Sequence, residues 1–220
     1  MFCVVYWFLK WKETDKGWIG EKKPFHARSK PRQMAESGHM KLPIVKIGNP
    51  ILRQKIRKVP SALLDKKAFR DFLRNMVATM RGAHGVGLAA NQVGKDSRVF
   101  VMECRGNRRY PRVTSVPLQA YLNVRIVRRS KAVEKGWEGC LSIPDFRAIV
   151  PRAKQVTFEA LTPEGKKVRR TVKDFEARIV QHEVDHLNGH FYIDRMDKKT
   201  WMHLEEFNRR FKSKVRDNKK

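Results

Sequence analysis

Three residues in one short segment have the chemistry to hold a metal ion and to move a proton. His182 and His186 are four positions apart, with Glu183 directly after the first. On an α-helix, residues four apart project from the same side, so both imidazoles could reach one divalent ion with the glutamate beside it as a base. The alternative is a pair of surface histidines with an ion-pairing glutamate. Phe175 and Ile179 would lie on the same side of the helix, which favours an inward-facing metal site.

A catalytic metal site of this kind usually needs a third protein ligand. One known pattern places a third histidine three residues after a glycine, but here Tyr192 stands at that position after Gly189, and His190 comes two residues early. Cys140 is the better candidate, because a thiolate is a strong ligand for zinc and for ferrous iron. A lone cysteine is also commonly a small buried apolar residue, so both interpretations of Cys140 stay open at this point.

A glycine-rich segment, residues 85–92, is the third place where the chain could meet a ligand. It reads Gly-Val-Gly-Leu-Ala-Ala-Asn-Gln, and its small residues would let the backbone approach a ligand closely. It is not a dinucleotide-binding fingerprint, because the third glycine and a surrounding strand–helix unit are missing. Taken alone, the segment could equally be a turn.

In this order, three segments together resemble peptide deformylase: Gly-Val-Gly-Leu-Ala-Ala-Asn-Gln, Glu-Gly-Cys-Leu-Ser and Gln-His-Glu-Val-Asp-His. This enzyme family removes the formyl group from the N-terminal methionine of newly made proteins. The resemblance extends from about Leu42 to Phe211. It implies an α+β domain in which antiparallel strands pack around a central metal-binding helix, with a C-terminal helix. It also implies hydrolysis of the formyl amide, with release of formate.

The resemblance implies roles for the residues around the metal. Cys140, His182 and His186 would ligate one divalent ion, Fe(2+) in the most active form, with Zn, Ni or Co as substitutes. Glu183 would act as general base and then as acid toward the leaving amine. Asp185 would orient a ligand or the base from outside the metal site.

The resemblance also implies how the substrate is held. Two donors would meet the formyl oxygen as it gains charge: the Gln92 side-chain amide and the Leu141 backbone N–H. The substrate backbone would pair with the protein as an added strand. The residues implied for substrate binding are Val86, Gly87, Gly139 and Arg147.

The apolar periodicity predicts a mixture of helices and short strands. Helices are expected at residues 63–80, 174–188 and 198–215, the second capped by Asp174 and ended by Gly189. Strands are expected at residues 98–102, 122–127, 155–161 and 168–172. A Thr-Pro-Glu-Gly turn signal at residues 162–165 would join the last two strands as a hairpin. This order of elements is that of an α+β domain.

The chain has 220 residues, enough for one domain with a hydrophobic core. We expect residues 1–39 to be a poorly ordered basic leader, 40–212 the catalytic domain, and 213–220 a basic tail. The leader could instead be an organelle-targeting segment, or Met40 could be the natural start.

Cysteine content and hydropathy bear on the compartment. Three cysteines without regular spacing argue against a disulfide framework. No run reaches the roughly 18 apolar residues of a membrane-spanning helix. We therefore expect no membrane partner and a cytoplasmic location, with an organelle as the alternative.

The charge balance is strongly basic: 49 Lys and Arg against 22 Asp and Glu give a net charge of +27. Such an excess favours an acidic partner, and nucleic acid is the commonest large one. Deformylases of one type carry a C-terminal helix that docks on the ribosome, and residues 195–220 hold ten Lys and Arg against four Asp and Glu. The resemblance therefore implies contact with ribosomal RNA through this basic helix. The alternative is a solvated helix end.

Two other functions fit part of this pattern. A metallopeptidase would use the same two histidines and glutamate, but Tyr192 in place of a third histidine, and the candidate ligand Cys140, disfavour it. A basic RNA-binding protein with a structural zinc site would explain the charge, but it would have no need for Glu183.

Overall fold

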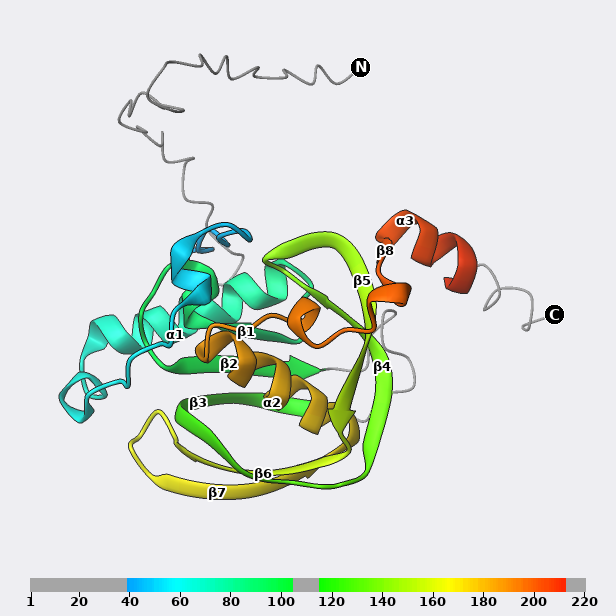
Figure 1. Cartoon of the computed structure of the whole chain (residues 1–220). Helices are drawn as coiled ribbons and strands as arrows, with labels where there is room; N and C mark the ends of the chain where they lie inside the picture. The colour runs from blue at the N-terminus through cyan, green and yellow to red at the C-terminus, as the bar shows by residue number, and fades with distance from the viewer. Residues whose placement is uncertain (1–38, 105–114, 213–220) are drawn as a thin grey trace, which may run out of the picture. The chain divides into compact units, whose positions relative to one another are not determined.

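The computed structural model describes residues 39–104 and 115–212, all within the compact unit Arg32–Lys220. This part of the chain is an α+β fold of antiparallel sheets and a few helices, as predicted (Figure 1). The larger sheet has the strand order β1-β2-β3-β6-β7, and the smaller has the order β4-β5-β8. The strands are β1 (Gly87–Ala89), β2 (Val99–Cys104), β3 (Val116–Arg129), β4 (Val133–Cys140), β5 (Ile143–Ala153), β6 (Gln155–Leu161), β7 (Lys167–Lys173) and β8 (Met202–His203). The α-helices are α1 (Lys67–Gly82), α2 (Asp174–Leu187) and α3 (Leu204–Phe207).

The helix α2 lies against strands of both sheets, within the curve of the larger one (Figure 1). Ile179, Val180 and Val184 belong to a core cluster that also contains the strand residues Phe100 and Phe158. Ten of its fourteen residues are buried, and several of these are polar or charged. Buried polar groups need partners inside the protein, so this helix is where internal hydrogen bonds and ion pairs must concentrate.

The helix α1 supports the glycine-rich segment that follows it. Phe69, Leu73, Met76 and Met80 recur every three or four residues and are all buried, so one stripe of the helix faces the core. They pack in a cluster with residues of β1 and β2, among them Leu88. The helix begins at Lys67, later than predicted, and residues 61–63 form a separate 3-10 turn.

The glycine-rich segment is more regular than a loop. It contains β1 and then a 3-10 helix, Ala90–Val93, which ends at Gly94 with a φ of 74°. A positive φ is accessible to glycine at little cost, so Gly94 can turn the chain away from the site.

Two strands that the sequence pattern did not predict, β4 and β5, form a hairpin. Their register pairs Trp137 with Ile149 and Glu138 with Ala148, and it shifts between Glu138 and Cys140. Among the described strands, β4 pairs only with β5, and β1 pairs only with β2. Each therefore has one edge without a partner strand in the described part of the chain, to which an extended chain could add.

The predicted hairpin of β6 and β7 is confirmed, with Gly165 in the turn at a φ of 81°. The helix predicted at residues 174–188 is also present as α2. Asp174 is the first residue of this helix rather than its cap, and its φ is 52°.

The predicted helix over residues 198–215 is wrong as a single element. The chain instead forms a 3-10 turn (Lys198–Thr200), the short strand β8, the single-turn helix α3 and a π-helical turn (Asn208–Lys212). Two residues of β8 pair with β5, and Phe207 and Phe211 pack on Trp137 of β4. These contacts take priority over the helical spacing of the apolar residues.

In the described part of the chain, no helix is long and apolar enough to cross a membrane. The expected leader and the tail at residues 213–220 lie, apart from residue 39, outside the described residues. Near the expected start of the domain, the Met40 N–H donates to the Asn75 side chain at 3.0 Å, so residue 40 is attached to α1.

Candidate metal centre and substrate cleft

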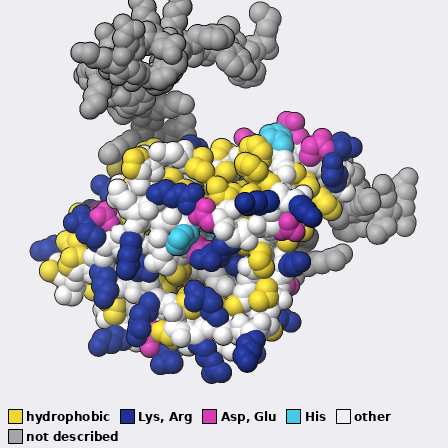
Figure 2. Space-filling model, viewed as in Figure 1, with side chains coloured by type: hydrophobic (Ala, Val, Ile, Leu, Met, Phe, Trp, Pro, Cys, Tyr) yellow, Lys and Arg dark blue, Asp and Glu magenta, His cyan; other side chains and the backbone are white. Residues whose placement is uncertain are grey.

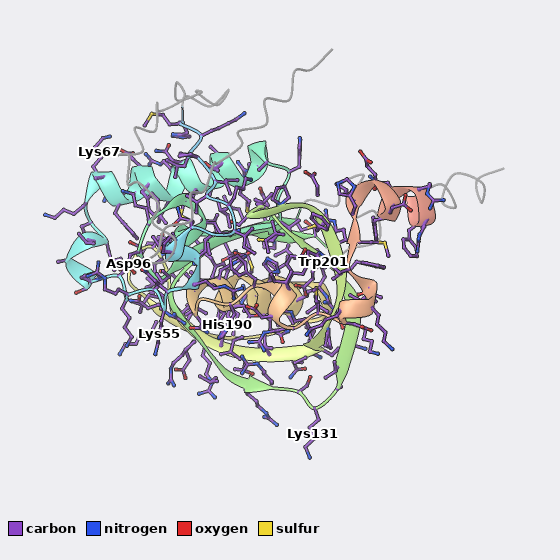
Figure 3. The ribbon with its side chains drawn as sticks, turned by 45° about the horizontal axis from the view of Figure 1, so that its top comes forward. Lys55, Lys67, Asp96, Lys131, His190 and Trp201 are labelled. Carbon is purple, nitrogen blue, oxygen red and sulfur yellow. The ribbon has the colours of Figure 1, made fainter. Side chains whose placement is uncertain are left out.

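The three candidate ligands come together between the end of β4 and the middle of α2. One ligand atom from each of Cys140, His182 and His186 lies within 4.8 Å of the other two. Cys140 Sγ is 3.2 Å from His186 Nε2, and the two imidazole centroids are 4.9 Å apart. His190, the rejected alternative, lies beyond the end of α2, with its Nδ1 4.0 Å from Asp194 (Figure 3). The structure therefore groups His182 and His186 with Cys140 and leaves His190 apart, as the sequence pattern suggested.

Glu138 fixes the orientation of the first histidine. Its Oε2 accepts a hydrogen bond from His182 Nδ1 at 2.9 Å, which leaves Nε2 of that ring able to bind a metal ion. Arg152 makes two bonds to the same carboxylate, at 2.9 and 3.0 Å, and Arg178 makes one at 2.8 Å. Burial alone would raise the pKa of Glu138, but His182 and Arg152 outweigh it and hold the pKa well below the usual range. Glu138 is thus a fixed anion behind the metal centre.

The hydrogen bonds of Asp185 connect it to the candidate ligands less directly than predicted. Its carboxylate binds Arg152 at 2.5 Å and Arg195 at 2.7 and 2.9 Å, not a histidine. Because Arg152 in turn holds Glu138, Asp185 supports the histidine through two intervening side chains. Arg152 and Glu138 are almost fully buried, and removing one partner of such a pair leaves an uncompensated charge inside the protein.

Cys140 lies in surroundings that stabilise its thiolate. Burial would raise the pKa of the thiol, but the charges and hydrogen bonds of His186 and His182 lower it well below its usual value. The Gln92 amide and the Ser142 backbone N–H each donate toward the sulfur at 3.4 Å. A thiolate is the form of cysteine that binds metal ions.

Glu183 follows His182 on α2, and its carboxylate lies against Gly87 of β1. Its Oε2 is buried and has no hydrogen-bond partner among the described residues. Burial raises the pKa of Glu183 to about 7, against the opposing effect of His182 and His186. A carboxyl group with such a pKa can accept and return a proton near neutral pH. A Cβ at Gly87 would collide with this carboxylate, so glycine is required there for the glutamate to occupy its place.

Gln92 is held with its amide nitrogen directed at the metal centre. Its Oε1 accepts the Ala89 N–H at 2.9 Å, which fixes the orientation of the amide group. Its Nε2 then points toward Cys140 and lies 3.2 Å from Ser142 Oγ. The neighbouring Asn91 donates to the His186 carbonyl at 2.7 Å and so attaches the glycine-rich segment to α2.

A cavity of about 310 Å³ opens onto the metal centre. Its apolar lining on α2 includes Phe175 and Ile179, which lie one or two turns before His182. The residues predicted to bind substrate all line it: Val86, Gly87, Gly139 and Arg147. Leu141 lines it too, and its carbonyl accepts from Lys46 Nζ at 2.8 Å.

Val86, Gly139 and Arg147 have contacts that explain their positions in the cleft. The Val86 carbonyl accepts the Glu103 N–H at 3.0 Å and so attaches the start of β1 to β2. The Arg147 guanidinium lies against Gly139, where any Cβ would collide with it. Glycine at 139 therefore leaves room for the Arg147 guanidinium beside β4.

Two residues of the site were not anticipated in these roles. Arg178 binds Glu138 and the backbone carbonyls of Glu134 and Val150, at 2.8 and 2.9 Å. Its spacing of four from His182 on the inner side of the helix was the available signal. Tyr192 is fully buried and stacks on His182 with an interplanar angle of 18°, so the residue at the position of a third histidine packs on a candidate ligand.

The donor set fits a divalent metal ion. One thiolate and two imidazoles suit zinc and ferrous iron alike. The His182 ring held by Glu138, the lowered pKa of Cys140 and the unpartnered Oε2 of Glu183 are all features that such an ion would use. The fold and site define a metal-dependent hydrolase.

Comparisons with known proteins agree with a metal-dependent hydrolase and identify its family. The family model described as polypeptide deformylase matches residues 41–201. A peptide deformylase 2 of Nostoc sp. is 40% identical over 156 residues, which is 71% of this chain and 86% of that protein. A peptide deformylase 2 of Pseudomonas putida is 40% identical over 153 residues, or 70% and 86% of the two chains.

Solved structures of peptide deformylases are also similar to this chain. A class I type b peptide deformylase from Acinetobacter baumannii with bound Met-Ala-Ser has a TM-score of 0.70 and 39% identity, covering 71% of this chain and 98% of that one. The actinonin complex of a Synechococcus elongatus peptide deformylase has a TM-score of 0.65 and 31% identity, covering 77% and 85%. This chain belongs to the peptide deformylase family. It is a metal-dependent hydrolase that removes the N-formyl group from formylmethionine at the start of new polypeptides.

Proposed function

We propose that Cys140, His182 and His186 hold the metal ion of the deformylation reaction and that Glu183 is its general base. The observation that supports this most strongly is the convergence of the three ligand atoms within 4.8 Å beside a buried, unpartnered carboxylate oxygen. When bound, such an ion polarises a carbonyl group and makes hydroxide available near neutral pH. We further propose that the ion is Fe(2+), with Zn, Ni or Co as substitutes.

The side chains of this site account for the movement of the proton. Glu183 takes a proton from water as the water oxygen bonds to the formyl carbon. As the bond from that carbon to the methionine nitrogen breaks, the same proton passes to the nitrogen. The products are formate and a free amino terminus. The pKa of Glu183, raised by burial to about 7, suits both the acceptance and the release of this proton.

The formyl oxygen gains negative charge when the carbon becomes tetrahedral. We assign its stabilisation to the Gln92 amide, whose Nε2 already points toward Cys140, and to the Leu141 backbone N–H, next along the chain from Cys140. Donors that are held in place before the reaction need no reorganisation as the charge develops.

Substrate binding follows from the two free strand edges. The edges of β1 and β4, at Gly87 and Gly139, both line the cavity, so an extended peptide can lie between them as an added strand. Val86 and Arg147 support these two positions. The methionine side chain would enter the apolar part of the cavity at Phe175 and Ile179 on α2.

The basic surface supports a proposed contact with ribosomal RNA. Lys and Arg side chains are spread over much of the face shown in Figure 2. At the C-terminal end, Arg209 and Arg210 lie 2.5 and 3.7 Å from Glu206, so this segment contributes less free positive charge than its composition suggests. Co-sedimentation with ribosomes at low salt tests the contact, and removal of residues 212–220 should weaken it; unchanged sedimentation would contradict a role for this segment.

We also propose the cytoplasm as the location and residues 40–212 as the catalytic domain. Deformylation must take place where formylated chains are made, which in an organelle would require a targeting role for residues 1–39.

The decisive experiment is release of formate from formyl-Met-Ala-Ser by protein that is prepared without oxygen and loaded with ferrous iron. Cys140→Ala should lose the metal, and Glu183→Ala should keep the metal but lose turnover. His190→Ala, a change in a histidine outside the site, is the matched control and should keep both. Loss of metal in the control, or full turnover in Glu183→Ala, would contradict the proposed roles.

A further inference from the structure

Two surface cavities adjoin on strand β3 of the larger sheet. Their volumes are about 560 and 440 Å³, and Arg129 lines both, so we treat the pair as one feature and call it the β3 groove. Among the described residues that line the groove, only Glu159 is acidic. The basic residues come from β3, from the link to β4 and from the segment before α1: Lys55, Lys58, Arg98, Arg125, Arg128, Arg129 and Lys131.

Most of this positive charge is not neutralised by the protein. The Glu159 carboxylate is shared by Arg125 and Arg169, at 2.7 and 3.3 Å. By contrast, Arg209 and Arg210 of the C-terminal segment both lie beside Glu206. Within residues 39–104 and 115–212, no ion pair involves the five other exposed cations of the groove, which are Lys55, Lys58, Arg128, Arg129 and Lys131. The groove therefore has free positive charge to offer to an anion.

Hydrogen bonds hold one wall of the groove in place. The Asn123 side chain accepts the Val59 N–H at 2.8 Å and donates to the Val59 carbonyl at 3.0 Å. These two bonds attach the segment that carries Lys55 and Lys58 to β3. Arg98 is buried, and its guanidinium donates to two backbone carbonyls and an asparagine side chain. Because this wall is already ordered, a ligand does not have to order it on binding, which favours affinity.

Irregular pairing of β3 with β6 shapes the groove. The register shifts between Leu122 and Arg125, and again between Ile126 and Arg128. Such irregularities bend a strand and redirect its side chains. Just after β3, Lys131 points away from the protein (Figure 3). From Arg125 to Lys131 the backbone spans about 20 Å at the rise of a strand, so the cations form a row rather than a single cluster.

The groove is separate from the cavity at the metal centre, since no described residue lines both. On α2, His182 and Glu183 line the cavity, whereas Val184 and Asn188 line the groove. Figure 2 shows Lys and Arg side chains gathered over the lower part of one face, where Figure 1 places β3, β6 and β7. A ligand in the groove would therefore leave the cleft open to a peptide.

The chemistry of the groove fits a polyanion that is bound through its backbone. Lys and Arg are the usual donors to the phosphate oxygens of nucleic acids. No aromatic side chain is present among the described residues that line the groove, so bases have no ring on which to stack. The substrates of this enzyme are made on ribosomes, so the polyanion closest to them is RNA.

We propose that the β3 groove binds the phosphate backbone of RNA, without preference for base sequence. It is a second surface, apart from the contact proposed for residues 212–220, and it does not depend on that contact or on the proposed catalytic roles. Binding there holds the enzyme on ribosomal RNA while its cleft stays open to new chains.

The first test is fluorescence anisotropy of a labelled single-stranded RNA of about 20 nucleotides, titrated with the full, metal-loaded chain. Each phosphate contact adds about −0.7 to the slope of log K against log salt, so five free cations predict a slope of about −3 or steeper. Two RNAs of different base sequence should bind equally. A slope near zero, or affinities that differ more than about tenfold between the two RNAs, would overturn the proposal.

A triple variant connects the binding to the groove. Arg128→Gln with Arg129→Gln and Lys131→Gln should lower the affinity for RNA about tenfold or more at low salt, and should make the slope less steep by about 2. All three side chains are exposed, so the fold should not change. Unchanged affinity in this variant would overturn the proposal.

A matched control removes the same charge elsewhere. Lys66, Lys198 and Lys199 are exposed and do not line the groove, and their joint replacement by Gln should change the affinity by about twofold or less. Equal losses in the two triple variants would show that the charge acts diffusely and would overturn the proposal.

Three further measurements separate this proposal from its neighbours. Formate release should be the same in the parent and in the groove variant, and a joint loss of RNA binding and turnover would contradict a separate site. Removal of residues 212–220 should leave the slope contributed by the groove, and complete loss of RNA binding in that variant would overturn the proposal. Binding to vesicles of equal parts phosphatidylglycerol and phosphatidylcholine, without binding to RNA, would assign the groove to a membrane surface instead.

Discussion

The two faces of strand β4 are stabilised by different kinds of contact. On the face toward α2, Glu138 is almost fully buried and binds two arginines and a histidine. On the other face, Trp137 packs against aromatic rings of the C-terminal segment, some of which are half exposed. Buried charges tolerate little change, because each removal leaves another charge unpaired. Aromatic packing at a surface loses its contribution gradually as contact area is lost. One strand thus has a buried charge network on one face and aromatic packing near the surface on the other.

Glu138→Ala should show the largest effect, because it removes the centre of the buried charge network. Arg178 would keep its charge inside the protein with only backbone carbonyls to bind, and Arg152 would keep Asp185 alone, at a cost of about 3–5 kcal/mol in the free energy of unfolding. Urea unfolding measures the loss. Glu159→Ala is the control, since this carboxylate pairs with two arginines that are largely exposed, and it should cost under about 1 kcal/mol. Equal losses in the two variants would contradict the contrast between buried and exposed pairs.

Gln92→Ala should slow turnover by roughly two orders of magnitude, because one oxyanion donor typically contributes about 3 kcal/mol to lowering the barrier. Metal content should stay unchanged, since the amide is not one of the proposed ligands. Formate release and metal analysis on the same sample measure the two effects. Gln54→Ala, a change at an exposed glutamine, is the control, and an unchanged rate in Gln92→Ala would remove this residue from the mechanism.

Acid should weaken the inner face of β4 more than the outer one. Burial would raise the pKa of Asp185, but Arg195 and Arg152 hold it below its usual value. A carboxylate with a lowered pKa stabilises the fold above its unfolded pKa, and that stability is lost as the pH falls toward the folded pKa. Between about pH 6 and pH 3, metal-free parent protein should therefore lose more unfolding free energy than Asp185→Asn. Parallel losses in urea unfolding would contradict this.

Phe211→Ala should have the smallest effect, because its ring is already 44% exposed. We expect a loss of about 1 kcal/mol in unfolding free energy, from partial burial and ring packing on Trp137. Phe100→Ala, at a fully buried ring of β2, should cost about 3–5 kcal/mol and sets the scale for the core. Metal content in Phe211→Ala should equal that of the parent, and a loss of metal would show that the two faces are coupled.

The sequence alone predicted the part of the site on α2 better than the part on β4. The spacing of His182, Glu183 and His186 is set by helix geometry and needs no information about distant residues. Cys140 is different: thiolate chemistry made it a candidate, but no spacing relates it to the histidines, which it reaches through the hairpin, and its assignment as a ligand came from the family resemblance.

The β4–β5 hairpin was missed because its sequence lacks the usual alternation. Gly136 and Gly139 interrupt the strand, and Glu138 and Arg152 are charged residues at buried positions. Their charges are neutralised by each other across the pair, which a pattern of apolar residues cannot reveal. The helix predicted at residues 198–215 failed for the opposite reason: Phe207 and Phe211 have a helical spacing, but their common partner is Trp137, more than sixty positions earlier in the chain.

The arrangement of the ligands also has a consequence for unfolding. Cys140 and His186 are 46 residues apart, and the intervening chain includes β5, β6 and β7. An ion bound to both would act as a cross-link on this loop, much as a disulfide does, and a loop of this length corresponds to about 4 kcal/mol of chain entropy in the usual model. Removal of the metal should then lower the free energy of unfolding by up to about that amount. The ion would then hold together the two ends of a segment that is about a fifth of the chain, besides taking part in the reaction.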